Sequence, residues 1–517
     1  MNRDKFIEKM QETPLWDVLI IGGGATGLGS ALDAAARGYR TLLLEQSDFA
    51  KGTSSRSTKL IHGGLRYLQQ GNISLVTEAL YERGLLCKNA PHLIHHLPFL
   101  VPNYHFWEGP FYGVGLKIYD LLAGELGIES SKHLSKEETL KQIPNLVAKD
   151  LKGGVVYYDG QFDDARLAIN LAHTASDEGA CLLNYMKVTS FIKKEKKIVG
   201  VRVKDIEKNI SYRIYAKAII NATGVFSDFL RKVDDPKAKS MIFPSQGVHI
   251  VLDKSFQRGK VAILVPKTED KRVLFMVPWH DRVLVGTTDT STDKAVLEPK
   301  ALKEEIEFLL HHAGIYLSKK PKASDILSVF AGLRPLVKEE SKKSTASTSR
   351  DHTIKVSSSK LITIAGGKWT TYRKMAEDVI DIAINMGKLP HRPCNTEKLK
   401  LHGWKKGLDP LKHFSTYGSD IKEIRALMRE RKSLAKKMHK NLPYYFVEVV
   451  WAIQKEMALT LEDVLSRRTR CLLLDVRATL EIAPKVASLM AKELKQNKTW
   501  EKTQLKLFQK CAKNYLP

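Results

Sequence analysis

The sequence predicts an α/β protein with three parts: a discontinuous Rossmann-like dinucleotide-binding domain, a domain built on an antiparallel sheet, and a helical C-terminal domain. Three observations support this prediction. A glycine-rich turn separates a strand-like run from an Ala-rich helix near the N-terminus. Four short strand-like segments follow one another between residues 247 and 288. From about residue 400 the pattern is helical and amphipathic, and 517 residues are too many for a single core.

The first element is "DVLIIGGGATGLGSALDAAARGYRTLLLE", which is typical of a strand, a glycine turn, a helix and a second strand. Gly22 allows the tight turn, Gly24 lets the backbone approach a pyrophosphate, and Gly27 lets the helix pack closely on the strand. Glu45 ends the second strand and is placed to accept hydrogen bonds from a ribose. The motif predicts dinucleotide binding, but it does not by itself distinguish FAD from NAD.

Two later segments favour FAD, because they return the chain to the same site. "NATGVFSD" places Thr223 and Gly224 at the end of a buried strand. "GGKWTTYRK" places a glycine pair, a lysine and threonines at the start of a helix, namely Gly366, Gly367, Lys368 and Thr370. The free amides and positive dipole end of a helix N-terminus suit the electron-rich side of a flavin ring.

The remaining pattern sets the predicted domain boundaries. Residues 187–224 alternate apolar and polar residues, which is typical of a β-meander that leads into a buried strand. "GVHIVL", "VAILV", "RVLFMVPW" and "RVLVGTT" are too closely spaced for βαβ units and indicate antiparallel strands. We therefore assign 1–100, 150–240 and 335–395 to the dinucleotide-binding domain, 101–149 and 241–334 to the substrate-binding domain, and 396–517 to the basic helical domain.

The net charge of +26 is concentrated near the C-terminus, where 25 Lys and Arg face 12 Asp and Glu from residue 400 onward. Such a surface favours polyanions, either an anionic membrane or a nucleic acid. We predict no nucleic-acid partner, because no nucleic-acid-binding motif is recognisable. The five scattered cysteines form no metal-ligand pattern, so we predict no metal and a reducing compartment. The start lacks the pattern of a secretory signal.

The apolar segment 111–128 has two interpretations. It is shorter than a bilayer-spanning helix and is interrupted by glycines. It fits either a helix lying in a membrane interface or a buried helix, and the sequence leaves both open.

Beyond these patterns, the sequence resembles the FAD-dependent glycerol-3-phosphate dehydrogenases, in the group of flavoenzymes similar to D-amino-acid oxidase. The similarity starts at Asp17 and runs through "TSSRSTKLIHGGLRYL", "INATGVFSD", "LVGTTDT", "FAGLRPL", "SRDHTI" and "GGKWTTYRKMAED" to "ALTLEDVLSRRTR". The resemblance implies FAD as cofactor and glycerol 3-phosphate as substrate. It also implies a membrane quinone as acceptor, a cytoplasmic protein attached peripherally to the inner membrane, and leaves a homodimer open.

The resemblance also implies roles for individual residues. The cofactor would contact the segment after the ribose-binding acid, at Ser54, Ser55, Ser57, His62, Gly63 and Gly64. A phosphate ester needs several cations, and arginine suits a bidentate grip on phosphate. The predicted substrate-binding residues are Arg66, Tyr67, Thr288, Arg334, Arg350 and Lys368. The predicted catalytic residues are His249 as the leading general base, Arg334 and His62. The alternative function is a related flavoenzyme that oxidises an amine or a 2-hydroxy acid.

Overall fold

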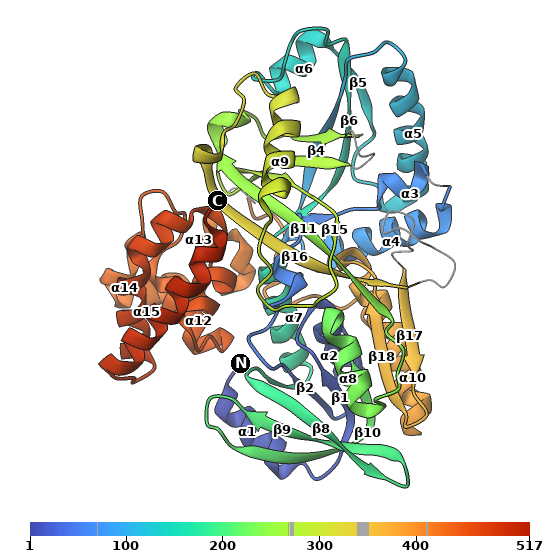
Figure 1. The fold of residues 1–517 in the computed structure, drawn as a ribbon, viewed down its shortest axis with the longest axis vertical. Coiled ribbons are helices and arrows are strands. Elements are labelled where there is room, and N and C mark those ends of the chain that lie inside the picture. The colour runs from blue at the N-terminus through green and yellow to red at the C-terminus, as the bar shows by residue number, and fades with distance from the viewer. Residues whose placement is uncertain (70, 267, 269–272, 339–350, 410–411) are drawn as a thin grey trace.

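The computed structural model describes residues 1–69, 71–266, 268, 273–338, 351–409 and 412–517. It contains two sheets, each with its own helices, and a helical C-terminal domain to one side (Figure 1). The fold class predicted from the sequence is confirmed.

The first sheet has eight strands, in the order β17-β18-β10-β1-β2-β7, and β8 and β9 extend it from β10. The central strands β18, β10, β1, β2 and β7 are mutually parallel, as in a Rossmann-like domain. The strands are β1 (Trp16–Ile21), β2 (Thr41–Leu44), β7 (Cys181–Leu183), β8 (Met186–Lys194), β9 (Lys197–Asp205), β10 (Ser211–Asn221), β17 (His352–Val356) and β18 (Leu361–Gly366).

Both faces of this sheet are covered, which explains why its strands are continuously apolar. Val18 and Ile20 of β1 pack in one core with three helices, α2 (Ala25–Ala36), α7 (Asp164–Asp177) and α10 (Tyr372–Gly387). Leu19 and Ile21 point to the other face. That face is covered by α1 (Arg3–Glu12), α8 (Ser227–Asp234) and the β8–β9 hairpin.

The second sheet has ten strands, in the order β15-β11-β14-β13-β12-β4-β6-β3, with β16 beside β11 and β5 beside β6. The four segments predicted to be antiparallel form β11 to β14, and this pairing is confirmed. The strands are β3 (Leu60–Ile61), β4 (Ile94–Asn103), β5 (Lys132–Ser135), β6 (Gly153–Phe162), β11 (Ile242–Asp253), β12 (Ala262–Val265), β13 (Leu274–Trp279), β14 (Arg282–Gly286), β15 (Thr290–Ser291) and β16 (Ile326–Val337).

Five helices accompany this sheet: α3 (Leu65–Gln69), α4 (Ile73–Asn89), α5 (Glu108–Ala123), α6 (Lys136–Gln142) and α9 (Lys303–Tyr316). Leu309 of α9 packs on Val248 and Ile250 of β11 in one core. Leu80 of α4 and Tyr119 of α5 share a core with β4 and β6. The segment at 111–128 is therefore a helix with one buried face.

The C-terminal domain consists of α11 (Ile421–Glu430), α12 (Phe446–Glu456), α13 (Cys471–Leu474), α14 (Val476–Glu493) and α15 (Lys498–Ala512). Buried apolar residues of α12 to α15 share one core with residues of the second sheet. The Ser328 hydroxyl of β16 donates to the Leu472 carbonyl at 2.9 Å. The domain is thus fixed to the body of the protein by burial as well as by hydrogen bonds.

The predicted domain boundaries need correction in four places. Residues 60–61, 94–100 and 153–162 fall in ranges predicted for the dinucleotide-binding domain, yet they form β3, most of β4 and β6 of the second sheet. β16 continues past the boundary predicted at 334/335. The sheet that a strand joins depends on pairing with segments far away in the sequence, which a division along the chain does not show.

Candidate functional site

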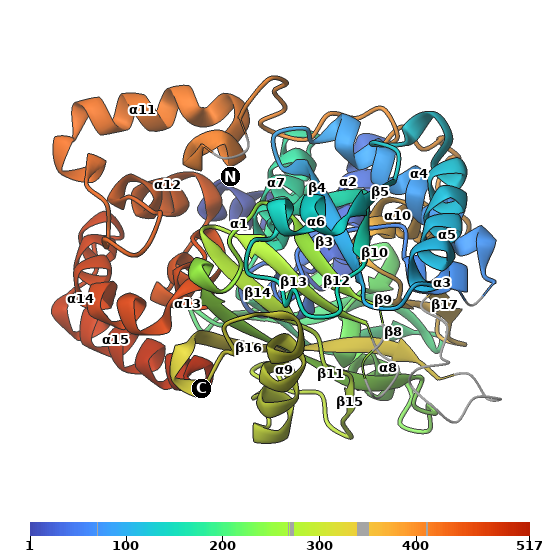
Figure 2. The same cartoon turned by 90° about the horizontal axis from the view of Figure 1, so that it is seen from above.

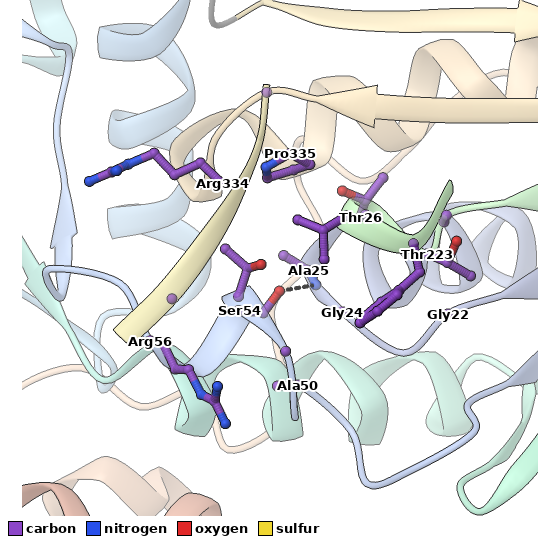
Figure 3. A pocket seen from close by; sticks show the side chains of 18 of the residues that line it. Gly22, Gly24, Ala25, Thr26, Ala50, Ser54, Arg56, Thr223, Arg334 and Pro335 are labelled. Carbon is purple, nitrogen blue, oxygen red and sulfur yellow. Dashed lines mark hydrogen bonds between the residues drawn. The ribbon is translucent and has the colours of Figure 1, made fainter. Parts of the chain in front are cut away.

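A cavity of 560 Å³ opens where the two sheets meet. It is lined by the turn after β1, the segment 50–58, the turn after β10, strand β16 and the turn after β18 (Figure 3). Its volume is within the range of cofactor sites. The predicted cofactor-binding residues that line it are Gly22, Gly24, Glu45, Ser54, Ser57, His62, Thr223, Gly224, Gly366, Gly367, Lys368 and Thr370.

The glycine turn brings the backbone of β1 close to that of β10. Gly22 has a φ of 114°, and a Cβ there would lie 2.6 Å from the Ala222 carbonyl oxygen. A Cβ on Gly27 would collide with the Gly22 carbonyl, so the third glycine packs helix against turn, as predicted. The turn leaves the N-terminus of α2 facing the cavity, where amides and a positive dipole end suit a pyrophosphate.

Ser54 lies opposite this helix end. Its hydroxyl accepts a hydrogen bond from the Ala25 amide at 2.9 Å, the interaction drawn as a dashed line in Figure 3. The Trp369 indole in turn donates to the Ser54 carbonyl at 3.0 Å. Ser54 is thus held at the place where a phosphate would approach the helix.

Glu45 lies in the cavity wall at the end of β2. Its two carboxylate oxygens accept the amides of Gly23 and Ser47 at 2.7 and 2.8 Å. Burial raises its pKa, although these two amides oppose the shift. Each oxygen keeps further lone pairs, so the carboxylate has the orientation and the capacity to accept ribose hydroxyls.

The polar groups of Ser55 and Ser57 already have partners within the protein, and the predicted contacts of these serines with the cofactor stay predictions. Ser55 is buried outside the cavity lining. Ser57 lines the cavity, but its amide and hydroxyl both donate to the Asp164 carboxylate, at 2.9 and 2.7 Å. Both serines therefore serve the conformation of the loop, because their polar groups find partners within the protein.

The segment around His62 closes the cavity from the side of the second sheet. The Thr370 hydroxyl is 3.2 Å from both the amide and the carbonyl of His62, so the backbone there is fixed to the helix start of the glycine pair. Gly64 has a φ of 85° and lies against Tyr67. Gly63 is buried and donates its amide to the Tyr119 hydroxyl at 2.8 Å. The predicted contact of Gly63 with the cofactor is therefore not part of this geometry.

A second cavity of 170 Å³ continues from the first. Thr58, Leu60, His62, Tyr67 and Arg334 line both. The rest of its wall is mainly apolar, with the polar groups of Asp159, Thr287 and Asp289. The place where the two cavities meet, which we call the junction, is where a small substrate could reach a flavin ring.

Arg334 is oriented at this junction by three partners. Its Nη2 donates to the Thr287 hydroxyl at 3.0 Å and to the Thr288 carbonyl at 3.1 Å, and its Nη1 is 3.3 Å from Asp289. Its side chain is 22% exposed, so the guanidinium remains accessible. An arginine held in one orientation suits a phosphate better than a mobile one does.

Lys368 contributes a second cation at the junction. Its ammonium lies 3.9 Å from the centroid of the Tyr67 ring, a cation–π distance. Tyr67 itself lines both cavities. The structure therefore brings together three of the predicted substrate-binding residues.

The other predicted substrate contacts come out differently. Thr288 lines the second cavity, but its hydroxyl donates to Glu305 at 2.9 Å and accepts the Val248 amide at 2.9 Å, so its contact with the substrate stays a prediction. Arg350 lies outside the described residues, and so does the side chain of Arg66 in α3.

His249 is presented by β11 to the large cavity, as predicted. Its ring stacks on Phe330 with centroids 4.9 Å apart, and its Nε2 is 2.9 Å from the Thr58 hydroxyl. Burial lowers its pKa well below the ordinary value, and Lys59 and Arg334 lower it further. The imidazole is therefore neutral at physiological pH and can accept a proton.

Sequence reasoning missed the charged group beneath this loop. The Lys59 ammonium is fully buried and pairs with Asp164 at 2.6 Å. Arg470, from the C-terminal domain, donates to the Ser55 carbonyl at 2.6 Å and to Asp164 at 3.1 Å. The signal available was the run "LSRRTR", whose arginines were counted as surface charge but are buried.

Comparison with known proteins agrees with this geometry. Residues 17–373 match the model of FAD-dependent oxidoreductases, and residues 360–504 match the C-terminal domain of α-glycerophosphate oxidase. The chain is 42% identical to the mitochondrial glycerol-3-phosphate dehydrogenase of Mesocricetus auratus, over 95% of this chain and 72% of that protein. It is 40% identical to that of Arabidopsis thaliana, over 95% of this chain and 84% of the relative.

A solved structure extends the comparison to the fold. The glycerol-3-phosphate dehydrogenase of Bacillus halodurans, complexed with FAD, superposes with a TM-score of 0.81 at 31% identity, covering 99% of this chain and 97% of that one. These similarities determine the family of the chain. The cavity agrees with them, because its glycine turn, helix end and carboxylate fit a flavin dinucleotide. The chain belongs to the glycerol-3-phosphate dehydrogenases of the FAD-dependent oxidoreductase family.

Proposed function

We propose that the protein oxidises sn-glycerol 3-phosphate to dihydroxyacetone phosphate and passes the electrons through FAD to a membrane quinone. The observation that carries the proposal is the junction, where Arg334, Lys368 and Tyr67 surround the opening between a cofactor-sized cavity and a small one. The family relationship supports the substrate, and the chemistry of the junction suits a small phosphate ester.

The residues around the large cavity fit FAD. The glycine turn and the N-terminus of α2 would hold its pyrophosphate, and Glu45 its ribose. The turns at Gly224 and Gly367, both with positive φ, let the backbone approach the ring. Bound there, FAD would supply the two-electron acceptor, its N5, for the hydride that C2 of the substrate loses.

The cations of the junction would bind the phosphate group. Arg334 is already oriented by Thr287 and Asp289, so it loses little conformational entropy on binding. Lys368 adds a point charge over the Tyr67 ring. Fixing the phosphate orients the rest of the substrate toward the ring, which is the main contribution that a protein makes to such a transfer.

The hydroxyl proton of the substrate needs an acceptor, and His249 is the proposed base. Its Nε2 lies 2.9 Å from the Thr58 hydroxyl, and Thr58 lines both cavities. Thr58 can therefore relay the proton from the substrate to the ring. Burial is the main cause of the low pKa of His249, and a dianionic substrate would offset only the smaller contribution from the positive charges of Lys59 and Arg334.

For the acceptor we propose a lipid-soluble quinone, reached by peripheral attachment at the cytoplasmic side of the inner membrane. No helix in the described part of the chain is long and apolar enough to span a bilayer. The apolar wall of the second cavity, with Phe99, Leu264 and Phe275, is compatible with a hydrophobic acceptor near the junction. Reduction of a soluble quinone analogue, compared with oxygen consumption, tests this part separately.

The first experiment is a visible spectrum of the purified protein, followed by anaerobic addition of sn-glycerol 3-phosphate. We expect a yellow protein that bleaches rapidly. Bleaching by an amine or a 2-hydroxy acid but not by glycerol 3-phosphate would move the function to the alternative substrate class. A colourless protein that cannot be reconstituted with FAD would contradict the proposal entirely.

A further inference from the structure

Helix α5 carries a stripe of exposed apolar side chains. Between residues 106 and 121, six large apolar residues expose 44% to 82% of their surface: Phe106, Trp107, Phe111, Val114, Ile118 and Leu121. From Trp107 onward they follow at steps of four, three, four and three residues, so they share one face of the helix. Soluble proteins rarely expose such a continuous apolar surface without a partner for it. We refer to these six residues as the α5 stripe.

The opposite face of α5 is buried, so the stripe does not result from a loosely attached helix. Tyr112, Leu116 and Tyr119 belong to the same core as Phe99 and Tyr157. The Tyr119 hydroxyl donates to Asp159 at 2.9 Å and accepts the Gly63 amide at 2.8 Å. Helix α5 is thus anchored to the core through its buried face, while its outer face is apolar and exposed to solvent.

Exposed charges of both signs lie beside the α5 stripe, and the acids among them, Glu125 and Glu129, are in the segment that follows the helix. The two carboxylates of the helix are turned toward the protein: Glu108 accepts the amides of Tyr104 and His105, and Asp120 accepts the amide and hydroxyl of Ser131. Three lysines, Lys117, Lys132 and Lys152, are exposed on the helix or on segments beside it. The Lys152 ammonium lies 4.6 Å from the centroid of the Phe106 ring.

We propose that the α5 stripe inserts into the interface of an anionic lipid bilayer and attaches the protein to it. An apolar helix face flanked by lysines, with a tryptophan and a phenylalanine at one end, has the composition of an interfacial membrane helix. The lysines would meet the anionic headgroups, whereas a second copy of this chain would bring the same lysines face to face. The inference rests on the proposed function, because a lipid-soluble acceptor requires contact with a membrane.

The distribution of net charge suggests that the C-terminal domain contacts the membrane, whereas the α5 stripe lies elsewhere on the molecule. The basic C-terminal helices lie on one side of the molecule and α5 on the opposite side, in both Figure 1 and Figure 2. Part of the C-terminal positive charge is also buried, at Arg467, Arg468 and Arg470. The C-terminal domain and α5 therefore predict opposite orientations of the protein on a membrane, and experiment can distinguish them.

Attachment through α5 would place the second cavity on the membrane side. Tyr119, on the buried face of the helix, packs against Tyr157 with ring centroids 6.1 Å apart. Tyr157 and Asp159 both line that cavity. A single layer of side chains thus separates the docking helix from the second cavity, which shortens the route for an acceptor dissolved in the bilayer.

The test uses the full-length, FAD-loaded protein and vesicles of phosphatidylcholine with or without phosphatidylglycerol. The variant Phe111→Glu/Leu121→Glu places two acids on the α5 stripe. The control Ile315→Glu/Leu507→Glu adds the same charge at exposed apolar positions elsewhere, one of them on α15; Leu507 and Phe111 are both 57% exposed. We expect the α5 variant to lose vesicle binding by about 10-fold or more, and the control to bind like the wild type.

Three outcomes would overturn the proposal. Equal loss in both variants would mean that added negative charge alone weakens binding. Loss only in the control would place the contact at α9 or α15 and not at α5. Wild-type protein that ignores vesicles but becomes monomeric on the α5 substitutions would mean that the stripe is an interface between copies. Glycerol 3-phosphate-dependent bleaching without vesicles separates these results from failure of the proposed function, because the α5 stripe lies outside the junction.

A second measurement avoids charged substitutions. Trp107 is 61% exposed at the start of the α5 stripe. Lipids brominated near the headgroup should quench the fluorescence of Trp107. The emission of Trp107 is obtained by subtracting the emission of the Trp107→Phe variant from that of the wild type. Equal quenching in the two proteins would contradict insertion at α5.

Discussion

The Asp48 carboxylate accepts hydrogen bonds from both terminal nitrogens of Arg468, at 2.6 and 2.8 Å, and both side chains are completely buried. Arg467 donates to the same carboxylate at 2.5 Å. Burial raises the pKa of Asp48, but the two guanidinium groups outweigh it and lower the pKa to about 2. The C-terminal domain is thus bonded through buried ion pairs to the loop that follows Glu45. Glu45 itself lines the cofactor cavity.

Replacing Asp48 with Asn should therefore destabilise the protein and weaken FAD binding together. Arg468 would lose its nearest counter-charge, and Arg467 would keep only its pairs with Glu462 and Asp463; breaking a buried pair costs about 3–5 kcal/mol of unfolding free energy. Thermal unfolding followed by flavin release measures both effects. Asp17→Asn is the matched control, because its partner Arg40 is 53% exposed and such pairs contribute about 0–1 kcal/mol. Equal effects of the two variants would contradict the role assigned to the buried group.

Glu45→Gln should lower the affinity for FAD by about 10-fold with little change in the fold. Both carboxylate oxygens accept backbone amides, so the amide nitrogen of Gln must face the amide of Gly23 or of Ser47. The variant also loses a charged acceptor for the ribose. Flavin fluorescence on dilution measures the affinity. An unchanged affinity would remove Glu45 from the ribose site.

The sequence was sufficient to predict the parts of the site that are made by local strand–turn–helix units. Gly22, Thr223 and Gly367 converge on one cavity because parallel strands bring the turns at their ends to the same edge. These predictions needed only the contiguous apolar run of a buried strand and the turn that follows it. The composition of those segments fixes both.

The parts that sequence reasoning missed depend on partners far away in the chain. The Ser57 hydroxyl binds Asp164, 107 positions later, and the Thr288 hydroxyl binds Glu305. A motif that resembles a known site shows that a hydroxyl group is present. It does not show whether that hydroxyl already forms hydrogen bonds with another residue of the same protein. The same reason explains why β4 and β6 were assigned to the wrong sheet: their pairing with each other is not encoded in either strand alone.

His249→Asn should reduce the rate of flavin reduction by about 100-fold or more, because it removes the proposed base. Thr58→Val should lower the same rate, since the Thr58 hydroxyl is the group within hydrogen-bond distance of Nε2. Stopped-flow bleaching with saturating glycerol 3-phosphate measures both. A slow His249 variant with a normal Thr58 variant would show that the proton reaches the ring directly. Two normal rates would remove His249 from the mechanism.

Arg334→Lys should raise the KM for glycerol 3-phosphate by about 10-fold or more, because lysine cannot make two parallel hydrogen bonds to a phosphate. It also loses the contacts with Thr287 and Asp289 that fix its orientation. Steady-state assays with a soluble acceptor measure KM and kcat separately. If only kcat fell and KM stayed the same, Arg334 would act on the reacting hydroxyl and not on the phosphate.

The stability of the protein should contain a contribution from His92 that falls as the pH is lowered. Burial lowers the pKa of His92 to about 4 in the folded protein, whereas an unfolded chain has a value of about 6.5. Above about pH 6.5 the ring is neutral in both states and the linkage vanishes. Between about pH 6.5 and 4 the unfolded chain binds a proton that the folded protein excludes, so unfolding becomes easier by up to about 1.4 kcal/mol per pH unit.

Replacing His92 with Gln removes this titration, so the unfolding free energy of the variant should depend less steeply on pH than that of the wild type in this window. Urea unfolding at several pH values measures the difference in slope, which isolates His92 from the carboxylates that titrate in the same range. The exposed His391, replaced in the same way, provides the control. This control removes an imidazole at an exposed position and should retain the wild-type slope. A His92 variant that also retained it would mean that the ring is protonated in the folded protein.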